Sequence, residues 1–481
     1  MKTLKEHCGI FGIFNNSLAS RYVYYGLYAL QHRGQEAAGI VTAQMGKQMF
    51  YHHREMGLVT KVFEEDSLFT QVLRGNIAIG HNRYSTAGDS DNKCNIQPLI
   101  GDFKGRTIAL AHNGNISNAN SIRKHLEERG YVFDSNSDTE VIIHLLNETH
   151  ETNLIEALKK ALLYLEGAFS LLIMTNDSLI AVRDSKGFRP LCVGKVEDSY
   201  CFASETCALD LVSAEFVTEV EPGQIHEINT EGYFVHTFKQ DPQLARCIFE
   251  YIYFSRPDSI IFGNSVDKMR RKFGQILAHE SPIPKCEEEV IVINVPDSSN
   301  IATVEYVQEC QKLGYKCRLE LALIRNHYIG RTFIMPHQDM RVDKLKLKFN
   351  PVKEILQNKI VVLVDDSIVR GNTSRTLVSM IRNAGAKEVH FRITSPPIID
   401  ACYYGMDFPK KSELIAYQMQ GDIEKIREFL GVDSLAYLSK EGLFKAVGEV
   451  YNVKESYCSA CFTGKHPYSL PSSSKKEANT V

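Results

Sequence analysis

The stretch IVVLVDDSIVRGNTSRT, residues 360–376, limits the possible folds more than any other part of this chain. A run of β-branched and apolar residues leads into two acids, then a short turn containing Gly371. A helix follows, which we expect to begin at Thr373 or Ser374. A strand that passes through a glycine turn directly into a helix is typical of an open parallel sheet.

The same stretch has the chemistry of a phosphate site. Ligands of open parallel sheets bind at the carboxyl ends of strands, where a helix N-terminus offers free N–H groups and a positive dipole end. The hydroxyls of Thr373 and Ser374 can add hydrogen bonds, and Asp365 and Asp366 would face sugar hydroxyls or a hydrated Mg²⁺. The alternative is that the two acids only cap a loop. The ordered combination of strand, acid pair, glycine turn and hydroxyl-bearing helix start favours the ligand site.

The rest of the second half alternates between strand and helix patterns. Strands are predicted at Val290–Val295, Ile360–Asp365 and Glu388–Thr394, and helices at Ile301–Cys310 and Ser374–Ala384. Another helix presents an apolar face made by Val266, Met269, Phe273, Ile276 and Leu277. This alternation predicts a doubly wound parallel sheet.

The first half consists mainly of short β-type runs. They are Cys8–Phe14, Gly39–Val41, Ile77–Gly80, Ile108–Ala111, Ser170–Met174 and Leu179–Arg183. Two helices are expected between them, at Ser121–Arg129 with a capping-type serine and at Asn153–Leu165. The pattern predicts antiparallel sheet layers with helices outside, and the polar stretch His236–Arg246 is the expected boundary between the halves.

Composition excludes several classes of protein. A chain of 481 residues should form two or three domains, and its net charge of −3 with spread basic residues does not indicate nucleic-acid binding. No apolar run reaches the roughly 18 residues of a membrane helix, and the first seven residues are no secretory signal. Twelve cysteines without an export signal predict reduced thiols and a cytoplasmic location.

Several motifs together resemble one family. The 360–376 stretch resembles the phosphoribosyl pyrophosphate (PRPP) loop of type I phosphoribosyltransferases. The wider resemblance is to the glutamine PRPP amidotransferases, the first committed enzymes of purine synthesis, through FEYIYFSRPDSIIFGNSV (249–266), VINVPDSSNIA (292–302), RNHYIGRTFIMPHQ (325–338), SPPIIDACYYG (395–405) and CSACFTGKHP (458–467). It covers nearly the whole chain.

The resemblance implies a particular domain organisation. Residues 1–7 would be a propeptide, residues 8–238 a class II glutamine amidotransferase domain folded as an N-terminal-nucleophile αββα sandwich, and residues 239–465 a phosphoribosyltransferase domain with a C-terminal cluster-binding segment. The Pro/Ser/Lys-rich tail 466–481 is predicted to be disordered.

Cys8, in MKTLKEHCGIFGIF, is the implied nucleophile of the first domain. A thiol needs a base, and an α-amino group with a pKa of roughly 7.7–8.0 suits neutral pH. That amine exists on Cys8 only if MKTLKEH is removed, so the heptapeptide is interpreted as a propeptide. The alternative is an ordinary buried strand thiol behind an N-terminal extension.

Three further motifs supply the implied glutamine site, with HRGQEAAGI (32–40) also matching the family pattern. In HNRYSTAG (81–88), Arg83 would hold the α-carboxylate of glutamine as a bidentate pair. In HNGNI (112–116), the Asn113 amide and the Gly114 N–H would stabilise the oxyanion. In SDTE (137–140), Asp138 would receive the α-ammonium. The alternative for Arg83 and Asp138 is a structural ion pair, and Asn-Gly alone is a common turn dipeptide.

The PRPP site is carried over in the same way. The resemblance implies contacts to PRPP from Asp365, Asp366, Ser367, Arg370, Gly371, Asn372, Thr373, Ser374 and Arg325. It implies Mg²⁺ near Ser298, Asp365 and Asp366. The chain departs from the family's Lys-Asn-Arg-Tyr at Arg325–Tyr328 and again over Asp339–Lys348, which puts the pyrophosphate contacts and the rate in question.

Four cysteines form a possible metal site. The Cys458/Cys461 pair alone could be a redox pair, half a metal site or two loose thiols. The resemblance adds Cys247 and Cys402, which match the ligands of a [4Fe–4S] cluster in one branch of the family, although spacing alone cannot choose between iron and zinc. The remaining cysteines, apart from Cys8, are interpreted as packing residues: Cys94, Cys192, Cys201, Cys207, Cys286, Cys310 and Cys317.

Three functions follow from these interpretations. The first is an amidophosphoribosyltransferase that hydrolyses glutamine at Cys8 and passes ammonia to C1 of PRPP, giving 5-phosphoribosylamine and pyrophosphate. The resemblance also implies a homotetramer with feedback by purine nucleotides. A sugar-phosphate aminating enzyme would share the first half but lack VDDSIVRGNTS. A PRPP-binding regulator without catalysis would be supported by the altered Arg325–His327 segment, but a regulator has no need of an oxyanion hole.

Overall fold

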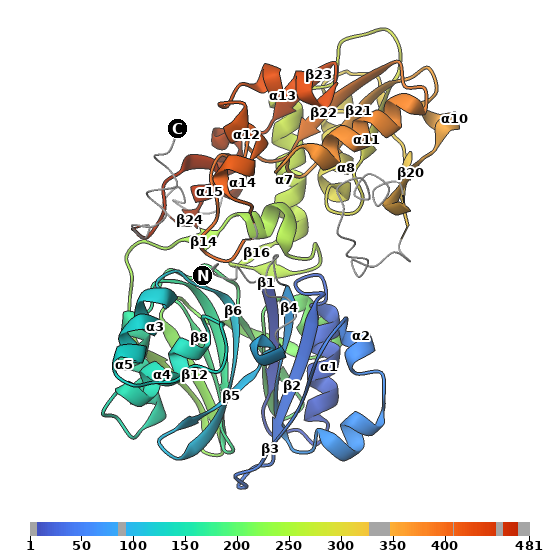
Figure 1. Ribbon diagram of the computed structural model, residues 1–481. Coiled ribbons are helices and arrows are strands. Elements are labelled where there is room, and N and C mark those ends of the chain that lie inside the picture. The colour runs from blue at the N-terminus through green and yellow to red at the C-terminus, as the bar shows by residue number, and fades with distance from the viewer. Residues whose placement is uncertain (1–6, 85–92, 327–346, 407, 449–455, 470–481) are drawn as a thin grey trace.

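The computed structural model describes residues 7–84, 93–326, 347–406, 408–448 and 456–469. Figure 1 shows two bodies that meet end to end, the lower one built from the first half of the chain and the upper one from the second. Within the described ranges, no helix is both long and apolar enough to span a bilayer.

The first body contains two antiparallel sheets packed face to face. One has the order β11 (Glu215–Glu219), β9 (Cys192–Val196), β10 (Ser199–Ala203), β1 (His7–Ile13), β4 (Ile77–Tyr84), β2 (Ala37–Ala43), β3 (Phe50–Met56). The other has the order β13 (Gly232–Thr237), β12 (Gln224–Asn229), β8 (Ser178–Arg183), β7 (Gly167–Met174), β6 (Arg106–Ile116), β5 (Leu99–Phe103). Alternate apolar residues of facing strands, such as Ile10, Ile79 and Leu172, fill the space between the sheets.

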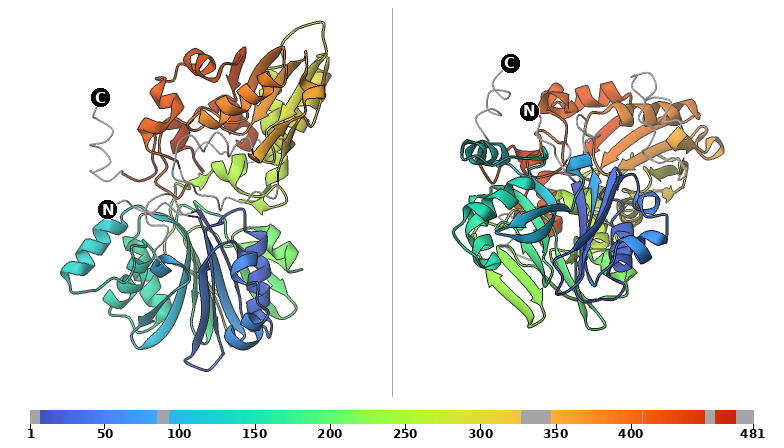
Figure 2. Two further views of the ribbon diagram at one scale, coloured as in Figure 1. Left: turned by 45° about the vertical axis from the view of Figure 1, so that its right-hand side comes forward. Right: turned by 60° about the horizontal axis from the view of Figure 1, so that its bottom comes forward.

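Helices cover both outer faces of this sandwich (Figures 1 and 2). The first sheet is covered by α1 (Ala19–Ala29), α2 (Val59–Val62) and α6 (Thr206–Leu211), and the second by α3 (Ala119–Glu128), α4 (Glu140–Glu148) and α5 (Leu154–Ala161). Short turns of other helix types occur at Leu68–Val72, Lys93–Asn95 and Leu162–Tyr164. The four layers confirm the predicted αββα sandwich.

One predicted helix start is wrong. Helix α3 begins two residues before Ser121, and the side chain of the preceding Asn118 does not cap it. That amide instead donates to the carbonyl of Tyr164 and accepts the N–H of Glu166, because the chain from a distant loop passes beside the helix start.

The second body is built on a five-stranded parallel sheet. Its order is β18 (Cys317–Leu319), β17 (Val290–Asn294), β21 (Ile360–Asp365), β22 (Glu388–Ile393), β23 (Ser434–Tyr437). One face is covered by α7 (Val266–Glu280) and α8 (Asn300–Lys312), and the other by α11 (Asn372–Asn383), α12 (Ile415–Gln418) and α13 (Ile423–Leu430). The doubly wound prediction is confirmed, and burial on both faces explains the continuous apolar runs of β17 and β21.

Short elements of this body were not predicted. The edge strands β18 and β23 have only three and four residues, too few for a periodic signal. The same holds for the hairpin of β19 (Leu323–Arg325) and β20 (Phe349–Pro351) and for helix α10 (Lys353–Leu356).

The C-terminal segment folds back onto the start of the second body. Strand β14 (Arg246–Cys247) pairs in parallel with β24 (Tyr457–Cys458), flanked by α14 (Lys440–Gly448) and α15 (Ala460–Thr463). A π-helical turn, Glu250–Phe254, and the small hairpin of β15 (Ile260–Ile261) and β16 (Asn264–Ser265) complete the junction between the two bodies. The predicted domain boundary at residue 238 falls between β13 and β14.

The tail is ordered further than predicted. The ring of His466 packs against Tyr403 at 5.2 Å, and Tyr468 stacks on Phe188 at 6.2 Å. Disorder from residue 466 is therefore wrong for residues 466–469, because these rings bury apolar area that the Pro/Ser/Lys composition concealed. The rest of the predicted tail, 470–481, lies outside the described residues.

Candidate active sites

Cys8 lies at the junction end of β1, in the middle of the first sheet. It is fully buried and is paired in register with Arg83 of β4. The next residue is fixed as well, because the Gly9 N–H donates to Asn82 Oδ1 at 2.7 Å. Residues 1–6 of the predicted propeptide lie outside the described residues, while the backbone of His7 continues β1. Removal of the heptapeptide stays a prediction.

The predicted oxyanion residues lie on β6, across the sandwich from β1. Asn113 is buried, and its side-chain amide is 3.4 Å from Ser204 Oγ, which also accepts the Ile10 N–H of β1 at 3.0 Å. Ser204 therefore links the nucleophile strand to the oxyanion strand. Gly114 has φ = +156°, and a Cβ there would meet the Ala168 carbonyl oxygen at 2.0 Å, so this position requires glycine.

Asp138 is held beside the same strand. Its Oδ2 accepts the Ile116 N–H at 2.8 Å, and His112 Nδ1 lies 3.7 Å from Oδ1. Burial acts to raise the pKa of Asp138, but the His112 charge and the hydrogen bonds outweigh it and hold that pKa below its usual range. An ionised Asp138 suits the predicted contact with an ammonium group.

Two buried histidines behind these residues were not predicted as site residues. His112 directly precedes Asn113, and His81 Nε2 contacts the His112 carbonyl at 3.2 Å. Burial, together with Arg83 and His112, lowers the pKa of His81 to about 3, so it is neutral near pH 7. His81 lies in the motif HNRYSTAG and His112 in the motif HNGNI. Their role depends on their burial, which the sequence does not reveal.

The second candidate site lies at the carboxyl end of β21. Asp365 ends the strand, and Asp366 accepts hydrogen bonds from the hydroxyls of Ser298 and Ser367. Burial raises the pKa of both carboxyls, and their mutual repulsion raises that of Asp365 further. A cation would be needed to keep the pair ionised, which fits the predicted Mg²⁺ role of these residues with Ser298.

The turn after the acid pair differs slightly from the prediction. Gly371 has φ = +77° and helix α11 begins at Asn372, one or two residues earlier than expected. Because Gly371 adopts a left-handed conformation, helix α11 starts at the next residue, and Thr373 and Ser374 lie in its first turn. A Cβ at Gly371 would meet Ile415 Cδ1 at 2.5 Å.

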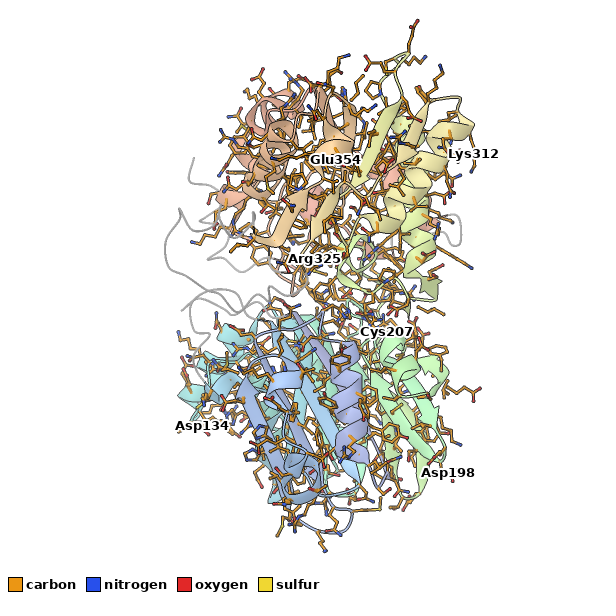
Figure 3. The ribbon with its side chains drawn as sticks, turned by 90° about the vertical axis from the view of Figure 1, so that its right-hand side faces the viewer. Asp134, Asp198, Cys207, Lys312, Arg325 and Glu354 are labelled. Atoms are coloured by element: carbon orange, nitrogen blue, oxygen red, sulfur yellow. The ribbon has the colours of Figure 1, made fainter. Side chains whose placement is uncertain are left out.

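The two predicted PRPP arginines contact acids. Arg370 pairs with Glu413 at 3.0 Å, and Arg325, labelled in Figure 3 at the edge of the second body that faces the first, pairs closely with Asp297. Both pairs are exposed to solvent, so each arginine can exchange its partner at little cost. The departures at His327–Tyr328 and most of Asp339–Lys348 lie outside the described residues.

The four cysteines of the predicted cluster gather at the junction. Cys247 and Cys458 are register partners in the β14–β24 pair, and the Cys461 carbonyl accepts the Ile399 N–H at 2.8 Å, which brings the Cys402 segment alongside. Burial raises the pKa of the Cys247 thiol to about 12, and burial and neighbouring thiols raise those of Cys458 and Cys461. Across the described ranges, however, no group of three or more His, Cys, Asp or Glu side chains is arranged to hold a single metal ion.

The interpretation of the other cysteines as packing residues is wrong at two positions. Cys94 and Cys286 are exposed, whereas Cys192, Cys201, Cys207, Cys310 and Cys317 are buried. The solvent exposure of a thiol depends on where its segment lies on the folded protein. The neighbouring residues in the sequence do not reveal that position.

Known proteins resemble this chain over most of its length. The glutamine amidotransferase domain model matches residues 81–211. The chain is 47% identical to amidophosphoribosyltransferase 2, chloroplastic, of Arabidopsis thaliana over 464 residues, covering 96% of this chain and 80% of that protein. It is 45% identical to the amidophosphoribosyltransferase of Bacillus subtilis, covering 97% of this chain and 95% of that one. The chain belongs to the amidophosphoribosyltransferase family.

Solved structures agree with this assignment. The structure described as the allosteric regulatory enzyme of purine biosynthesis superimposes with a TM-score of 0.89 at 43% identity, covering 97% of both chains. The glutamine PRPP amidotransferase of Bacillus subtilis, complexed with ADP and GMP, gives a TM-score of 0.88 at 43% identity, covering 98% of this chain and 99% of that one. The predicted family, fold class and enzyme class are confirmed. The chain is a glycosyltransferase-type enzyme with a glutamine amidotransferase domain, in a family that carries out the first step of purine biosynthesis.

Proposed function

We propose that the chain converts glutamine, PRPP and water to 5-phosphoribosylamine, glutamate and pyrophosphate. The observation that carries this proposal is the presence of two sites in one chain. In one, a nucleophile strand faces an oxyanion strand across the sandwich, and in the other an acid pair precedes a helix N-terminus. Together they account for nitrogen released in one body and used in the other.

In the first body, the Cys8 thiolate attacks the side-chain amide of glutamine. The α-amino group freed by removal of residues 1–7 takes the thiol proton. The Asn113 amide and the Gly114 N–H stabilise the oxyanion, while Arg83 and Asp138 bind the α-carboxylate and the α-ammonium. The burial of Cys8, Arg83 and Asn113, and the hydrogen bond that Asp138 accepts from the Ile116 N–H, support the assignment.

In the second body, the first turn of α11 and the side chains around it bind the phosphates of PRPP. The residues are Ser367, Arg370, Gly371, Asn372, Thr373 and Ser374, with Arg325 from β19. Mg²⁺, held by Ser298, Asp365 and Asp366, would neutralise the pyrophosphate charge. Because the bodies meet end to end, ammonia can pass between the sites without release to solvent, where most of it would become non-nucleophilic ammonium.

An assay of product release tests the proposed function. Protein supplied with glutamine, PRPP and Mg²⁺ is expected to form glutamate and pyrophosphate in equal amounts, each measured separately. Chelation of Mg²⁺ should stop pyrophosphate release. Binding of PRPP without pyrophosphate release from either glutamine or ammonia would instead indicate the regulator.

We propose that Cys247, Cys402, Cys458 and Cys461 hold a [4Fe–4S] cluster. Cys247, Cys402 and Cys461 are buried and Cys458 is half-buried. Burial raises the thiol pKa of Cys247, Cys458 and Cys461, so these thiols need a metal to become thiolates together. A four-iron cluster is larger than a single ion, so its four cysteine ligands lie farther apart than the ligands of one zinc ion. Among the described residues, the four thiols gather at the junction without the arrangement of a single-ion site, which favours the cluster over zinc. The cluster would tie the C-terminal segment to the junction and supply stability or oxygen sensitivity rather than catalysis.

Cys458→Ser is expected to lower iron content and soluble yield together, because the C-terminal segment loses its attachment to β14. Protein purified without oxygen should be brown, with about four irons per chain. Iron analysis and the visible spectrum are the measurements, and the buried Cys310→Ser serves as the matched control. Colourless, fully active protein containing stoichiometric zinc would reject the iron assignment.

The remaining proposals concern assembly and regulation. We propose a cytoplasmic homotetramer that purine nucleotides inhibit. The support for feedback is the likeness to the Bacillus subtilis enzyme, whose structure was solved with ADP and GMP.

A further inference from the structure

The main-chain carbonyl of Cys8 is held by one buried arginine. Arg33 follows helix α1, is fully buried, and donates from Nε to the Cys8 oxygen at 3.1 Å. Under the proposed function Cys8 becomes the first residue of the chain and loses the preceding peptide bond as an anchor. The bond from Arg33 and the pairing of β1 then determine where the nucleophile lies.

Arg33 is in turn fixed by a carboxylate from the other body. Its Nη2 donates to Glu250 Oε1 at 2.9 Å and its Nη1 to Glu250 Oε2 at 3.2 Å, a bidentate pair. The guanidinium lies over the Phe254 ring, 4.4 Å from its centroid. Both partners of Arg33 come from the Glu250–Phe254 turn. The arginine that orients Cys8 is therefore held by the second body.

Glu250 is ionised, and both of its carboxylate oxygens accept hydrogen bonds. It is 0% exposed, and it also accepts hydrogen bonds from Arg189 Nη1 at 2.8 Å and from the Ser255 hydroxyl at 2.6 Å. Burial acts to raise the pKa of Glu250, but Arg33 and Arg189 outweigh it and keep that pKa below its usual range. Buried ion pairs add little net stability, so a network of this kind is better suited to fixing geometry.

A second carboxylate closes the network from the first body. Glu205, at the N-terminus of α6, binds Arg33 Nη1 closely and accepts from His32 Nε2 at 2.7 Å and from the Ser259 hydroxyl at 2.6 Å. Its neighbour Ser204 is the residue that links Ile10 to Asn113. Arg33 is therefore held between one carboxylate from each body, directly behind the glutamine site.

The Glu250 turn is also fixed from the PRPP side. Arg270 of α7 donates to the carbonyls of Tyr251 at 2.9 Å, Tyr253 at 2.9 Å and Ser255 at 2.8 Å. Arg270 is buried and close enough to Asp366 for each charge to shift the pKa of the other. The turn is therefore a rigid element between the Cys8 arginine and the acid pair.

We propose that Glu250 is a positioning residue for glutamine hydrolysis. It acts through Arg33, which holds the Cys8 carbonyl, so the second body completes the geometry of the nucleophile in the first. The inference rests on the proposed function in taking Cys8 as the nucleophile. Glu250 touches neither glutamine nor PRPP in this role.

Glu250→Gln in the mature, full-length enzyme tests this role. The substitution keeps the shape and removes the charge that orients Arg33. We expect kcat for glutamine-dependent glutamate formation to fall about 10- to 100-fold, the size of effect that a small misplacement of a reacting group produces. KM for glutamine should change little, and pyrophosphate release with high ammonia should stay within about twofold.

Two further variants make the result decisive. Ser255→Ala removes one hydrogen bond to Glu250 and should lower the glutamine-dependent kcat about threefold, a test that remains available if Glu250→Gln fails to fold. Glu219→Gln is the matched control, because Glu219 pairs with buried Arg183 at 3.4 Å and accepts the Gly263 N–H at 2.7 Å without contacting Arg33. It should leave the ratio of the two activities unchanged.

The outcomes separate this inference from the proposed function. Equal losses with glutamine and ammonia in Glu250→Gln, or unchanged glutamate formation, would overturn the positioning role. Wild-type protein that forms glutamate but no pyrophosphate would overturn the proposed function, while glutamate formation by the variants would still test Glu250.

Discussion

Cys8→Ala is expected to lower glutamine-dependent formation of 5-phosphoribosylamine by at least about 10⁴-fold, since no other group can take over the covalent step. Amination with high ammonia should persist, because the second site lies in a separate body. Pyrophosphate release with each nitrogen donor is the measurement. The variant is best produced from a chain lacking residues 1–7, so that loss of activity does not reflect retained propeptide.

Cys201→Ala is the matched control, because Cys201 is a fully buried thiol on β10 of the same sheet. It should keep both activities. The intact mass of active wild-type protein should show the loss of residues 1–7. Active enzyme that still carries them would contradict the α-amino group of Cys8 as the base, and glutamine use by Cys8→Ala would contradict the nucleophile itself.

Asp366→Asn is expected to lower PRPP turnover about 100- to 1,000-fold with either glutamine or ammonia, the scale typical of removing one group that stabilises transition-state charge. The amide keeps the size of the side chain but supplies no negative charge for a cation between Ser298 and Asp365. Initial rates of pyrophosphate release at saturating Mg²⁺ measure the loss.

Asp198→Asn provides the control, because exposed Asp198 lies in the turn between β9 and β10, at the end of the first body remote from the second (Figure 3). Its rates should match those of wild type. A loss confined to the glutamine-driven reaction would place Asp366 in ammonia formation or transfer and contradict its assignment to the PRPP site.

Much of the fold was predictable from local patterns. The runs at 290–295 and 360–365 are apolar throughout because both faces of a parallel sheet are covered, and this pattern is visible without tertiary structure. Short elements escaped prediction, since β18 and β23 form only because neighbouring strands offer an edge. Helix α11 starts at Asn372, before the predicted Thr373 or Ser374, because Gly371 adopts a positive φ. A glycine permits this conformation but does not require it.

The candidate sites divide in the same way. Cys8, Arg83, Asn113 and Asp138 were assigned through short motifs that resemble the family. The Asp365–Asp366 pair was also assigned from its place between a strand and a glycine turn. Glu250, Glu205 and Arg33 were not found as a group, although HRGQEAAGI and FEYIYF were both noted. Their significance lies in contacts between residues more than 170 positions apart along the chain.

The sequence alone therefore determined the two sheet types and the order of the bodies, because strand periodicity and helix starts are local properties. Through motifs that resemble the family, it also indicated the candidate site residues. Only the tertiary structure decided which groups act on one another, such as the carboxylates on either side of Arg33 and the packing of His466 and Tyr468. Burial and distance set those charges and contacts. Both quantities depend on how the whole chain folds back on itself.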